Sequence, residues 1–262
     1  MARAAAFFDL DKTIIATSST LALGRSFFDS GLITRRQVLR GAYARFVYAL
    51  GRADADRMAR MRDDLARLVT GWEVRQVTEI VDEALHDLID PMIYAEALEL
   101  IEAHRLSGRA IVIVSSSGEE VVAPIGEMLG ADHVVATRLV VRDGRYTGEI
   151  AFYAAGPHKA EAMREMAQRH GWDLAESYAY SDSTTDLPML EAVGHPNAVN
   201  PERGLRRAAD ANGWPVLRFA HPVALRRRLP PVTPAAAGVV GIAGIAVAAL
   251  IGRGLVKRHG QR

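Results

Sequence analysis

The sequence predicts an α/β fold in which a parallel sheet carries helices on both faces. Three apolar runs rich in β-branched or aromatic residues read as buried strands, at residues 4–8, 111–114 and 177–181. Each run ends in a cluster of polar side chains, and the second leads directly into a helical pattern at Glu119–Leu129. Because open α/β sheets bind ligands beyond the carboxyl ends of their strands, these polar clusters are candidate site residues.

The first cluster contains Asp9, Asp11 and Thr13. Side chains repeat every second residue along a strand, so the two carboxylates project to the same side at its end. Two crowded acids repel each other unless a cation neutralises them, and this spacing favours a hard metal such as Mg²⁺. The alternative is that the tripeptide D-x-D only caps a helix.

The second cluster is the run from Ser115 to Gly118. A small polar turn before a helix offers unpaired backbone N–H groups and the positive end of the helix dipole, and both favour phosphate. Ser115 and Ser116 are therefore candidate phosphate-binding residues. The alternative is that these hydroxyls only cap the following helix.

Two further clusters complete the pattern. Lys159 lies at the start of a helical stretch over residues 160–170, where a positive charge opposes the helix dipole. Neutralising a phosphate would explain it, and a solvated surface lysine is the alternative. Asp182 ends the third strand and Asp186 follows four residues later. This spacing allows one carboxylate to bind a metal and the other to support it.

The order of acid pair, hydroxyl, lysine and acid pair resembles the haloacid dehalogenase (HAD) superfamily, in its phosphoserine-phosphatase-like subfamily, from about Ala5 to Phe219. The resemblance implies a Rossmann-like core, an inserted helical cap and Mg²⁺ as cofactor. It makes Asp9 the nucleophile and Asp11 the general acid and base. The metal ligands that it implies are Asp9, Asp11 (through its backbone carbonyl) and Asp182; the phosphate-binding residues are Ser115, Ser116 and Lys159; the supporting residues are Thr13, Thr185 and Asp186.

These residue types predict a phosphatase that cleaves a phosphomonoester through an aspartyl-phosphate. Mg²⁺ and the lysine would neutralise the phosphoryl charge, and Asp11 would protonate the leaving alkoxide and then take a proton from water. Two alternatives stay open, a phosphotransferase that uses the same intermediate and a catalytically silent, membrane-associated regulatory protein. The sequence contains no cysteine, which excludes thiolate chemistry.

The chain divides by its patterns into four parts. We expect a catalytic core at residues 1–16 and 89–222, and a helical cap at 17–88 with apolar helical faces over 38–50 and 80–88. A β-hairpin is predicted at 134–141 and 145–153 around an Asp-Gly turn. The segment Gly194–Pro201 is interpreted as a rigid turn, with His195 and Asn197 as weaker candidates for substrate contact. A linker follows at 223–234, and then an apolar helix at 235–256.

The predicted substrate is a small phosphorylated metabolite or a phospholipid head group. In phosphoserine phosphatases a glutamate shortly after the first motif meets the substrate's amino group, and counting forward places that position at Ser18, which argues against phosphoserine. The segment from Arg25 to Arg62 contains nine arginines and only three aspartates. This composition suits binding of a polyanionic substrate or surface, or else a solvated helix face. No nucleic-acid partner is expected.

The C-terminal region differs in character from the rest. Residues 235–252 carry no charge, and 18 apolar residues lie near the lower limit for a membrane span. From Val223 onward there are seven Lys or Arg and no Asp or Glu, which leaves the remaining chain with a balance of −6 and suits an anionic membrane surface. Because Met1–Ala6 runs straight into the first strand, we expect no signal peptide and a C-terminal anchor on the cytoplasmic face. The alternatives are a soluble cytoplasmic protein and a tail helix that packs on the body or between chains.

Overall fold

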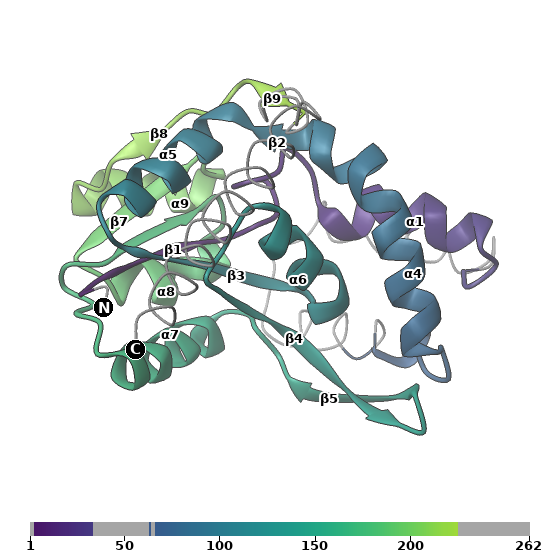
Figure 1. The fold of residues 1–262 in the computed structure, drawn as a ribbon. Helices are drawn as coiled ribbons and strands as arrows, with labels where there is room; N and C mark the ends of the chain where they lie inside the picture. The colour runs from purple at the N-terminus through teal and green to yellow at the C-terminus, as the bar shows by residue number, and fades with distance from the viewer. Residues whose placement is uncertain (1–2, 34–62, 64–65, 225–262) are drawn as a thin grey trace, which may run out of the picture. The chain divides into compact units, whose positions relative to one another are not determined.

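The computed structural model describes residues 3–33, 63 and 66–224, and Figure 1 shows their arrangement. A seven-stranded sheet has the order β5-β4-β3-β1-β6-β7-β8. Neighbouring strands are parallel, except that β4 and β5 pair in antiparallel fashion. The predicted α/β class with a mostly parallel sheet is therefore confirmed.

The strands and helices expected near residues 4–8, 119–129, 134–153, 160–170 and 177–181 are present, but residues 115–118, expected to form a turn before a helix, are the end of a strand. The strands are β1 (Ala5–Phe8), β2 (Ile93–Tyr94), β3 (Ala110–Gly118), β4 (His133–Arg142), β5 (Arg145–Phe152), β6 (Tyr178–Ser181), β7 (His195–Val199), β8 (Val216–Leu217) and β9 (Pro222–Val223). The α-helices are α1 (Ser19–Asp29), α4 (Val74–Ala84), α5 (Ala95–Leu106), α6 (Glu119–Met128), α7 (Pro157–His170), α8 (Leu187–Glu191) and α9 (Arg203–Asn212). Shorter turns of π-helix (Leu85–Ile89) and 3₁₀-helix (Asp90–Met92, Thr184–Asp186) join some of them.

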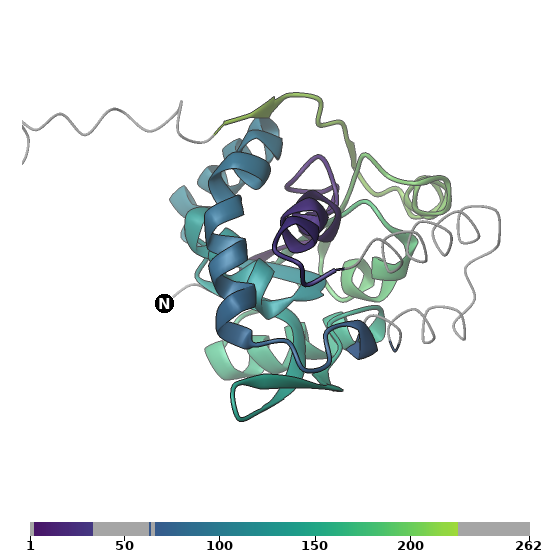
Figure 2. The same ribbon diagram turned by 90° about the vertical axis from the view of Figure 1, so that its right-hand side faces the viewer.

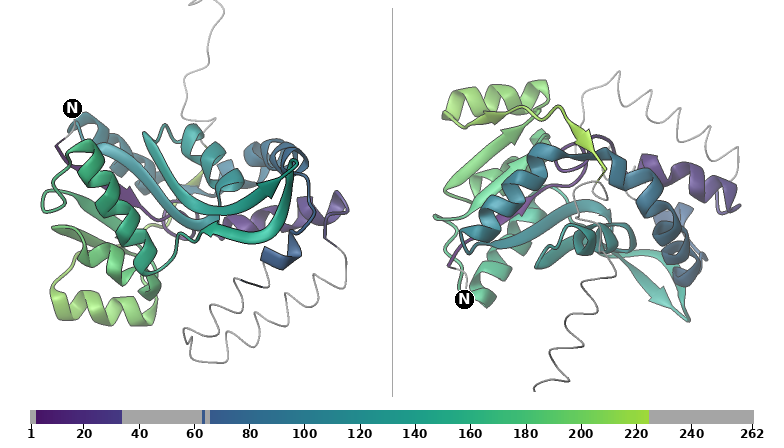
Figure 3. Two further views of the ribbon diagram at one scale, coloured as in Figure 1. Left: turned by 90° about the horizontal axis from the view of Figure 1, so that it is seen from below. Right: turned by 45° about the horizontal axis from the view of Figure 1, so that its top comes forward.

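Helices cover both faces of the sheet, as Figure 1 and the left view of Figure 3 show. All four residues of β1 are buried, because Ala6 and Phe8 face one apolar core while Ala5 and Phe7 face the other. Helices α5 and α6 contribute to the first core, and α7, α8 and α9 to the second. A strand that is covered on both sides needs apolar residues at every position, which explains the continuous run in the sequence.

Helices α1 and α4 lie side by side, as Figure 2 shows, and their apolar residues join the first core. Gly31 follows α1 and Gly71 precedes α4, and both have positive φ angles, of 80° and 84°. Glycine adopts this conformation without strain, so each of the two residues suits the position beside a helix where the chain changes direction. Of the predicted apolar face over 80–88, Val81, Ala84 and Leu85 are buried; the predicted face over 38–50 lies outside the described residues.

The predicted β-hairpin is confirmed as β4 and β5. Its two-residue turn has positive φ at both Asp143 (50°) and Gly144 (73°), as a type I′ turn requires. The hairpin also pairs with the segment that leads into α4, since the N–H of Gly71 donates to the carbonyl of Tyr146 at 2.8 Å and the N–H of Tyr146 donates to the carbonyl of Trp72 at 3.1 Å. These bonds attach the start of α4 to the core.

The interpretation of residues 194–201 as a turn was wrong. Residues His195–Val199 form strand β7, which pairs in parallel with β6. A proline is tolerated because β8 pairs only with Ala198 and Val199, so Pro196 lies on a free strand edge. The turn begins at Asn200, whose φ is 42° and whose side-chain amide binds both the N–H and the carbonyl of Phe219.

The predicted linker and apolar helix fall almost entirely outside the described residues. Val223 still belongs to β9, which pairs with β2. Among the helices of residues 3–33 and 63–224 that the structure describes, none has the length and apolar character to cross a bilayer. The predicted membrane helix at 235–256 is not tested by this observation.

Candidate active site

A buried lysine joins two of the predicted acids at the carboxyl end of the sheet. Asp9 follows β1 and is fixed to β6 by a hydrogen bond from its N–H to the carbonyl of Tyr180 at 2.9 Å. The ammonium of Lys159 donates to Oδ1 of Asp9 at 2.7 Å and to Oδ2 of Asp186 at 2.8 Å. The hydroxyl of Ser181 also donates to Oδ2 of Asp186, at 2.7 Å. Residues from β1, β6 and α7 thus meet at one point, as predicted.

The environment of Lys159 excludes a solvated surface lysine. Helix α7 starts at Pro157, so Lys159 lies in its first turn, yet its side chain is only 3% exposed. Burial opposes the lysine's charge, but the carboxylates of Asp186 and Asp9 outweigh it and raise the pKa of Lys159 above its usual value. The lysine is therefore a permanent buried cation between two acids.

The pKa of the Asp9 carboxyl group is also raised, but for an acid this favours the neutral form. Burial raises its pKa, Lys159 lowers it, and the charges of Asp186 and Asp182 raise it again, so that the net shift is upward. The pKa of Asp182 is raised as well, to about 6, mainly by burial, while Lys12 acts against the shift and Asp186 and Glu202 add to it. One lysine does not neutralise this group of acids. A further positive charge at Asp9 and Asp182 would favour their ionised forms.

The acids around Lys159 also decide whether Mg²⁺ fits this site. Within the described part of the chain, no group of three or more His, Cys, Asp or Glu side chains is arranged to hold a metal. Mg²⁺ does not require one, because it keeps several waters and is usually held by one or two carboxylates together with substrate phosphate. Asp9 and Asp182 interact electrostatically and supply oxygen donors with raised pKa values. This donor set fits Mg²⁺.

Asp11 lies apart from the lysine. Its carboxylate accepts hydrogen bonds from the N–H of Ser19 at 2.8 Å, from the hydroxyl of Ser117 at 3.2 Å and from the hydroxyl of Ser18 at 3.4 Å. Asp11 is half-buried, whereas Asp9 is buried. The two motif-one acids therefore have different partners, and only Asp9 touches Lys159.

The three serines at the end of β3 point to two different sides of the strand. Ser115 and Ser117 are buried, and Ser116 between them is exposed, as expected from the alternation of side chains along a strand. The hydroxyl oxygen of Ser115 accepts a hydrogen bond from the N–H of Ser117 at 3.2 Å. The side chain of Ser116 points the other way, although its carbonyl accepts a bond from Thr137 at 2.8 Å. The structure thus separates Ser116 from Ser115.

The supporting residues have mixed partners. The hydroxyl of Thr13 is buried and finds no hydrogen-bond partner among the described residues. Thr185 bonds within its own turn, since its N–H donates to the hydroxyl of Ser183, which caps the 3₁₀ turn. Sequence reasoning missed Lys12, Ser117 and Glu202. The first two lie inside the quoted motifs, whereas Glu202 carried no recognisable signal.

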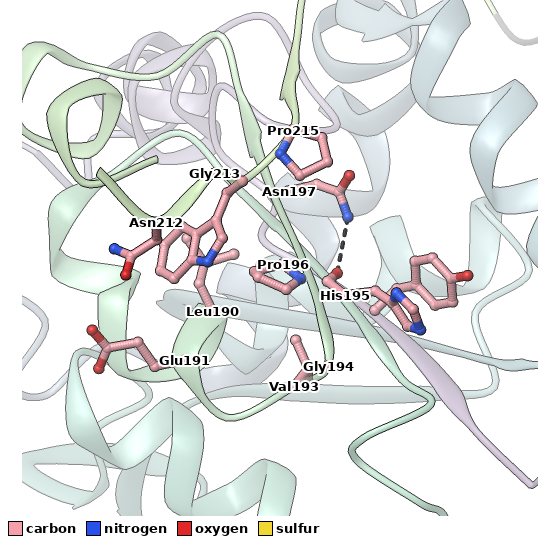
Figure 4. A pocket seen from close by; sticks show the side chains of 12 residues that line it. Leu190, Glu191, Val193, Gly194, His195, Pro196, Asn197, Asn212, Gly213 and Pro215 are labelled. Atoms are coloured by element: carbon pink, nitrogen blue, oxygen red, sulfur yellow. Dashed lines mark hydrogen bonds between the residues drawn. The ribbon is translucent and has the colours of Figure 1, made fainter. Parts of the chain in front are cut away.

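His195 and Asn197 lie away from these residues. Both line a pocket of about 560 Å³ between β7, α8 and the connection from α9 to β8 (Figure 4). Figure 4 shows the amide of Asn197 turned back onto the carbonyl of His195, with a distance of 2.9 Å. None of the predicted catalytic, metal-binding, phosphate-binding or supporting residues lines this pocket. The structure does not bring these two residues to the predicted site.

A buried aspartate–lysine–aspartate group lies beyond the carboxyl end of a parallel sheet, which is where open α/β folds bind their ligands. The chain belongs to the haloacid dehalogenase-like hydrolases, whose family model matches residues 6–191. Within that superfamily it is phosphoserine-phosphatase-like, and it is an enzyme of the phosphatase type.

Several relatives support this assignment. A Streptomyces azureus protein named for inhibition of morphological differentiation is 61% identical over 94% of this chain and 90% of its own length. A probable phosphatase of Mycobacterium tuberculosis is 56% identical over 95% and 86% of the two chains. A phosphoserine phosphatase of the same organism is 32% identical over 95% and 80%.

The fold has a similar solved structure. A protein of unknown function from Bordetella pertussis superimposes with a TM-score of 0.74 and 30% identity, over 83% of this chain and 99% of its own. The α/β fold that the sequence predicts is therefore shared with a protein whose structure has been solved.

Proposed function

We propose that this protein is a Mg²⁺-dependent phosphomonoester hydrolase in which Asp9 is the nucleophile. The observation that carries the proposal is the buried bond of 2.7 Å between Lys159 and Asp9, with Asp186 on the far side of the lysine. A carboxylate attacks phosphorus only when the charge on the phosphoryl oxygens is neutralised. A buried cation beside the attacking group supplies that condition. Bound Mg²⁺ would add further charge neutralisation at Asp9 and Asp182.

In the proposed reaction the two motif-one acids have separate roles. A carboxylate oxygen of Asp9 attacks phosphorus, the bond from phosphorus to the substrate oxygen breaks, and Asp11 gives its proton to the leaving alkoxide. Asp11 then takes a proton from water, the water oxygen attacks phosphorus, and the bond to Asp9 breaks to release phosphate. Lys159 remains protonated throughout, because Asp186 and either the Asp9 carboxylate or the phosphoryl group bound to it hold the pKa of Lys159 high.

The buried hydroxyl of Ser115 is suited to hold a phosphoryl oxygen. Its oxygen already accepts from the N–H of Ser117, so its proton is the free part of the group. The N-terminus of α6 follows directly, and its backbone N–H groups favour an anion. We assign phosphate binding to Ser115 and Lys159, and only a backbone role to Ser116.

The proposed substrate is a small organic phosphomonoester, with a phospholipid head group as the second class. Phosphoserine is disfavoured, because Ser18 carries no charge to meet an amino group and its hydroxyl approaches Asp11 at 3.4 Å. Residues 17–88 would form the cap that selects the substrate, around the core at 1–16 and 89–222. Selectivity within this class follows from that cap.

The test is Mg²⁺-dependent phosphate release from phosphoserine, sugar phosphates, nucleoside monophosphates and phosphatidylglycerophosphate. Asp9→Asn should abolish release on every substrate, and Asp29→Asn, the same change at an exposed ion pair on α1, should not. Equal activity of Asp9→Asn and the native chain would remove Asp9 as nucleophile. If the native chain releases nothing, binding of beryllofluoride distinguishes an untested substrate from a silent fold, and alcohol phosphate among the products indicates phosphotransfer.

Membrane attachment through residues 235–256 remains a proposal that rests on the sequence alone. A chain without residues 232–262 should leave the membrane fraction and still hydrolyse a water-soluble substrate. Identical fractionation of the two chains would show that this segment is not an anchor.

A further inference from the structure

We propose that Ser117 is a positioning residue for Asp11 and holds its carboxylate through a hydrogen-bond chain that begins at Ser19. The inference rests on the proposed role of Asp11 as general acid and base. Ser117 lies two residues after the phosphate-binding Ser115 and was not among the predicted site residues. Its contacts assign it to a different task from that of Ser115.

Ser117 reaches Asp11 from the other side of the site. Its hydroxyl donates to Oδ2 of Asp11 at 3.2 Å, although 106 residues separate them in the chain. Its oxygen also lies 3.0 Å from the hydroxyl oxygen of Ser19. The N–H of Ser19 donates to the other oxygen of Asp11, at 2.8 Å. The carboxylate is therefore held at both oxygens, from β3 and from the start of α1.

The direction of this hydrogen-bond chain follows from the number of protons that each group can donate. An ionised carboxylate only accepts, and a serine hydroxyl has one proton to give. Because Ser117 gives its proton to Asp11, the bond between the two serines must be donated by Ser19. The order is thus Ser19 to Ser117 to Asp11. Both hydroxyls can rotate, so the chain can reverse when Asp11 gains a proton.

Burial makes this chain stiff. Ser19 is fully buried and Ser117 is 8% exposed. Water therefore has little access to replace either hydroxyl, and a lost hydrogen bond leaves a buried polar group without a partner. Ser18 occupies the N-cap position of α1 but its side chain makes no capping bond there, and Asp11 binds the first N–H of the helix instead. A negative charge is favourable at a helix N-terminus. Asp11 and the first turn of α1 are therefore linked.

The first experiment uses the leaving group as a probe. General acid help matters for an alkyl phosphate, whose alkoxide leaves poorly, and little for p-nitrophenyl phosphate, whose phenolate leaves easily. Because kcat/KM covers the steps up to departure of the leaving group, Ser117→Ala should lower it about tenfold on an alkyl phosphomonoester, the size expected for one hydrogen bond to a charged group. On p-nitrophenyl phosphate the loss should stay below about twofold.

A matched control separates positioning from loss of a buried hydroxyl. Ser177 is fully buried, accepts from the N–H of Ala5 at 3.0 Å and donates to the carbonyl of Asp173. Ser177→Ala should lower the melting temperature and leave the ratio between the two substrates unchanged. Ser19→Ala, which keeps the N–H bond to Asp11, should move that ratio in the same direction as Ser117→Ala but less. Equal losses on both substrates in Ser117→Ala would overturn the inference.

A double variant shows whether Ser117 acts through Asp11. In Asp11→Asn the further change Ser117→Ala should lower kcat/KM on the alkyl phosphomonoester by less than about twofold, against about tenfold in the native background, because the group that it positions is gone. An undiminished effect in that background would also overturn the inference. If Asp9→Asn is inactive and Asp11→Asn shows the leaving-group effect while Ser117→Ala does not, only this inference fails. Activity in Asp9→Asn would instead remove the proposed function.

Discussion

Glu202 holds Thr184 through both of that residue's polar hydrogens. The N–H of Thr184 donates to Oε1 of Glu202 at 2.8 Å, and its hydroxyl donates to the same oxygen. The N–H of Glu202 in turn donates to the carbonyl of Asp182 at 2.9 Å. The turn that carries Asp182 and Asp186 is thus fastened to the segment between β7 and α9.

We expect Glu202→Ala to weaken the use of Mg²⁺. The change removes both side-chain bonds to Thr184 but keeps the backbone bond to Asp182, so it weakens the support of this proposed metal ligand indirectly. The Mg²⁺ concentration for half-maximal turnover should therefore rise about tenfold, the lower end of the range for loss of a ligand's outer partner. Glu202→Gln keeps an acceptor and should have a smaller effect. The measurement is a Mg²⁺ titration of activity, with the exposed Glu176→Ala as control. An unchanged titration in Glu202→Ala would show that the turn after Asp182 keeps its conformation without the Glu202 side chain.

The site motifs could be predicted because each is local. Asp9 and Asp11 are two residues apart at the end of an apolar run, and the position of Lys159 in a first helical turn conflicts with the helix dipole unless an anion is near. Those two arguments need no knowledge of the rest of the chain. They single out Asp9 and Lys159 as candidates, but the contact between the two joins residues 150 positions apart and was not predicted.

The contacts of Ser117 and Glu202 could not be predicted in the same way. Ser117 and Asp11 are 106 residues apart in the chain, and β3 shifts register against β4 between Val114 and Gly118, so no local pattern records their contact. The strand β7 was misread because prolines and asparagines are turn signals, whereas its pairing with β6 is a long-range contact. At β7 the pairing with a distant strand outweighs the local preference of these residues for a turn.

Removal of Mg²⁺ should stop turnover, and its effect on stability should depend on pH. Burial raises the pKa of Asp9 to about 8 and that of Asp182 to about 6, so below pH 6 the folded protein holds protons that Mg²⁺ must displace. In the metal-free protein a raised carboxyl pKa makes stability fall as the pH rises from about 4 to 8, and bound Mg²⁺ reverses this loss.

The measurement is the melting temperature with Mg²⁺ and with EDTA, at pH 5.5 and pH 8. Mg²⁺ should stabilise more at pH 8, by roughly 2–4 °C for each kcal/mol of binding free energy. Asp9→Asn should reduce the difference between the two pH values. The same Mg²⁺ effect at both pH values, or full activity in EDTA, would contradict the proposed metal site.

His104 should make the free energy of unfolding decrease in acid. Burial, aided by the charge of Arg109, lowers the pKa of His104 to about 4. Arg109 only donates, so the Nδ1 of His104 that faces it at 3.5 Å is the acceptor, and Nε2 donates to the hydroxyl of Tyr180 at 2.8 Å. The unfolded chain binds a proton near pH 6.5 and the folded chain does not, so stability is lost as the pH falls from 6.5 to 4.

The size of this effect is about 3 kcal/mol at most, from the difference between the two pKa values. Urea denaturation at pH 4.5 and 6.5 should show a smaller change in His104→Gln than in the native chain. The exposed His158→Gln serves as control, since its partner Glu161 lies on the same helix face. Parallel pH curves for His104→Gln and the native chain would contradict the buried neutral histidine.

Lys159→Met should destabilise the fold as well as abolish activity. The substitution leaves the carboxyls of Asp9 and Asp186 buried without their cation, and breaking one side of such a pair costs about 3–5 kcal/mol. Urea denaturation in EDTA at pH 7.5 measures this loss with no metal present. Lys159→Arg keeps the charge but not the volume, and should lie between the native chain and Lys159→Met.

A second substitution decides whether the loss comes from unpaired charge. If it does, adding Asp186→Asn to Lys159→Met removes one of the two uncompensated carboxylates and should restore part of the stability, while activity stays absent. The single variant Asp186→Asn keeps the bond between Lys159 and Asp9, so it should lose less stability than Lys159→Met. Additive losses in the double variant would mean that Lys159 stabilises the fold by packing, and that the buried acids are already neutral without it.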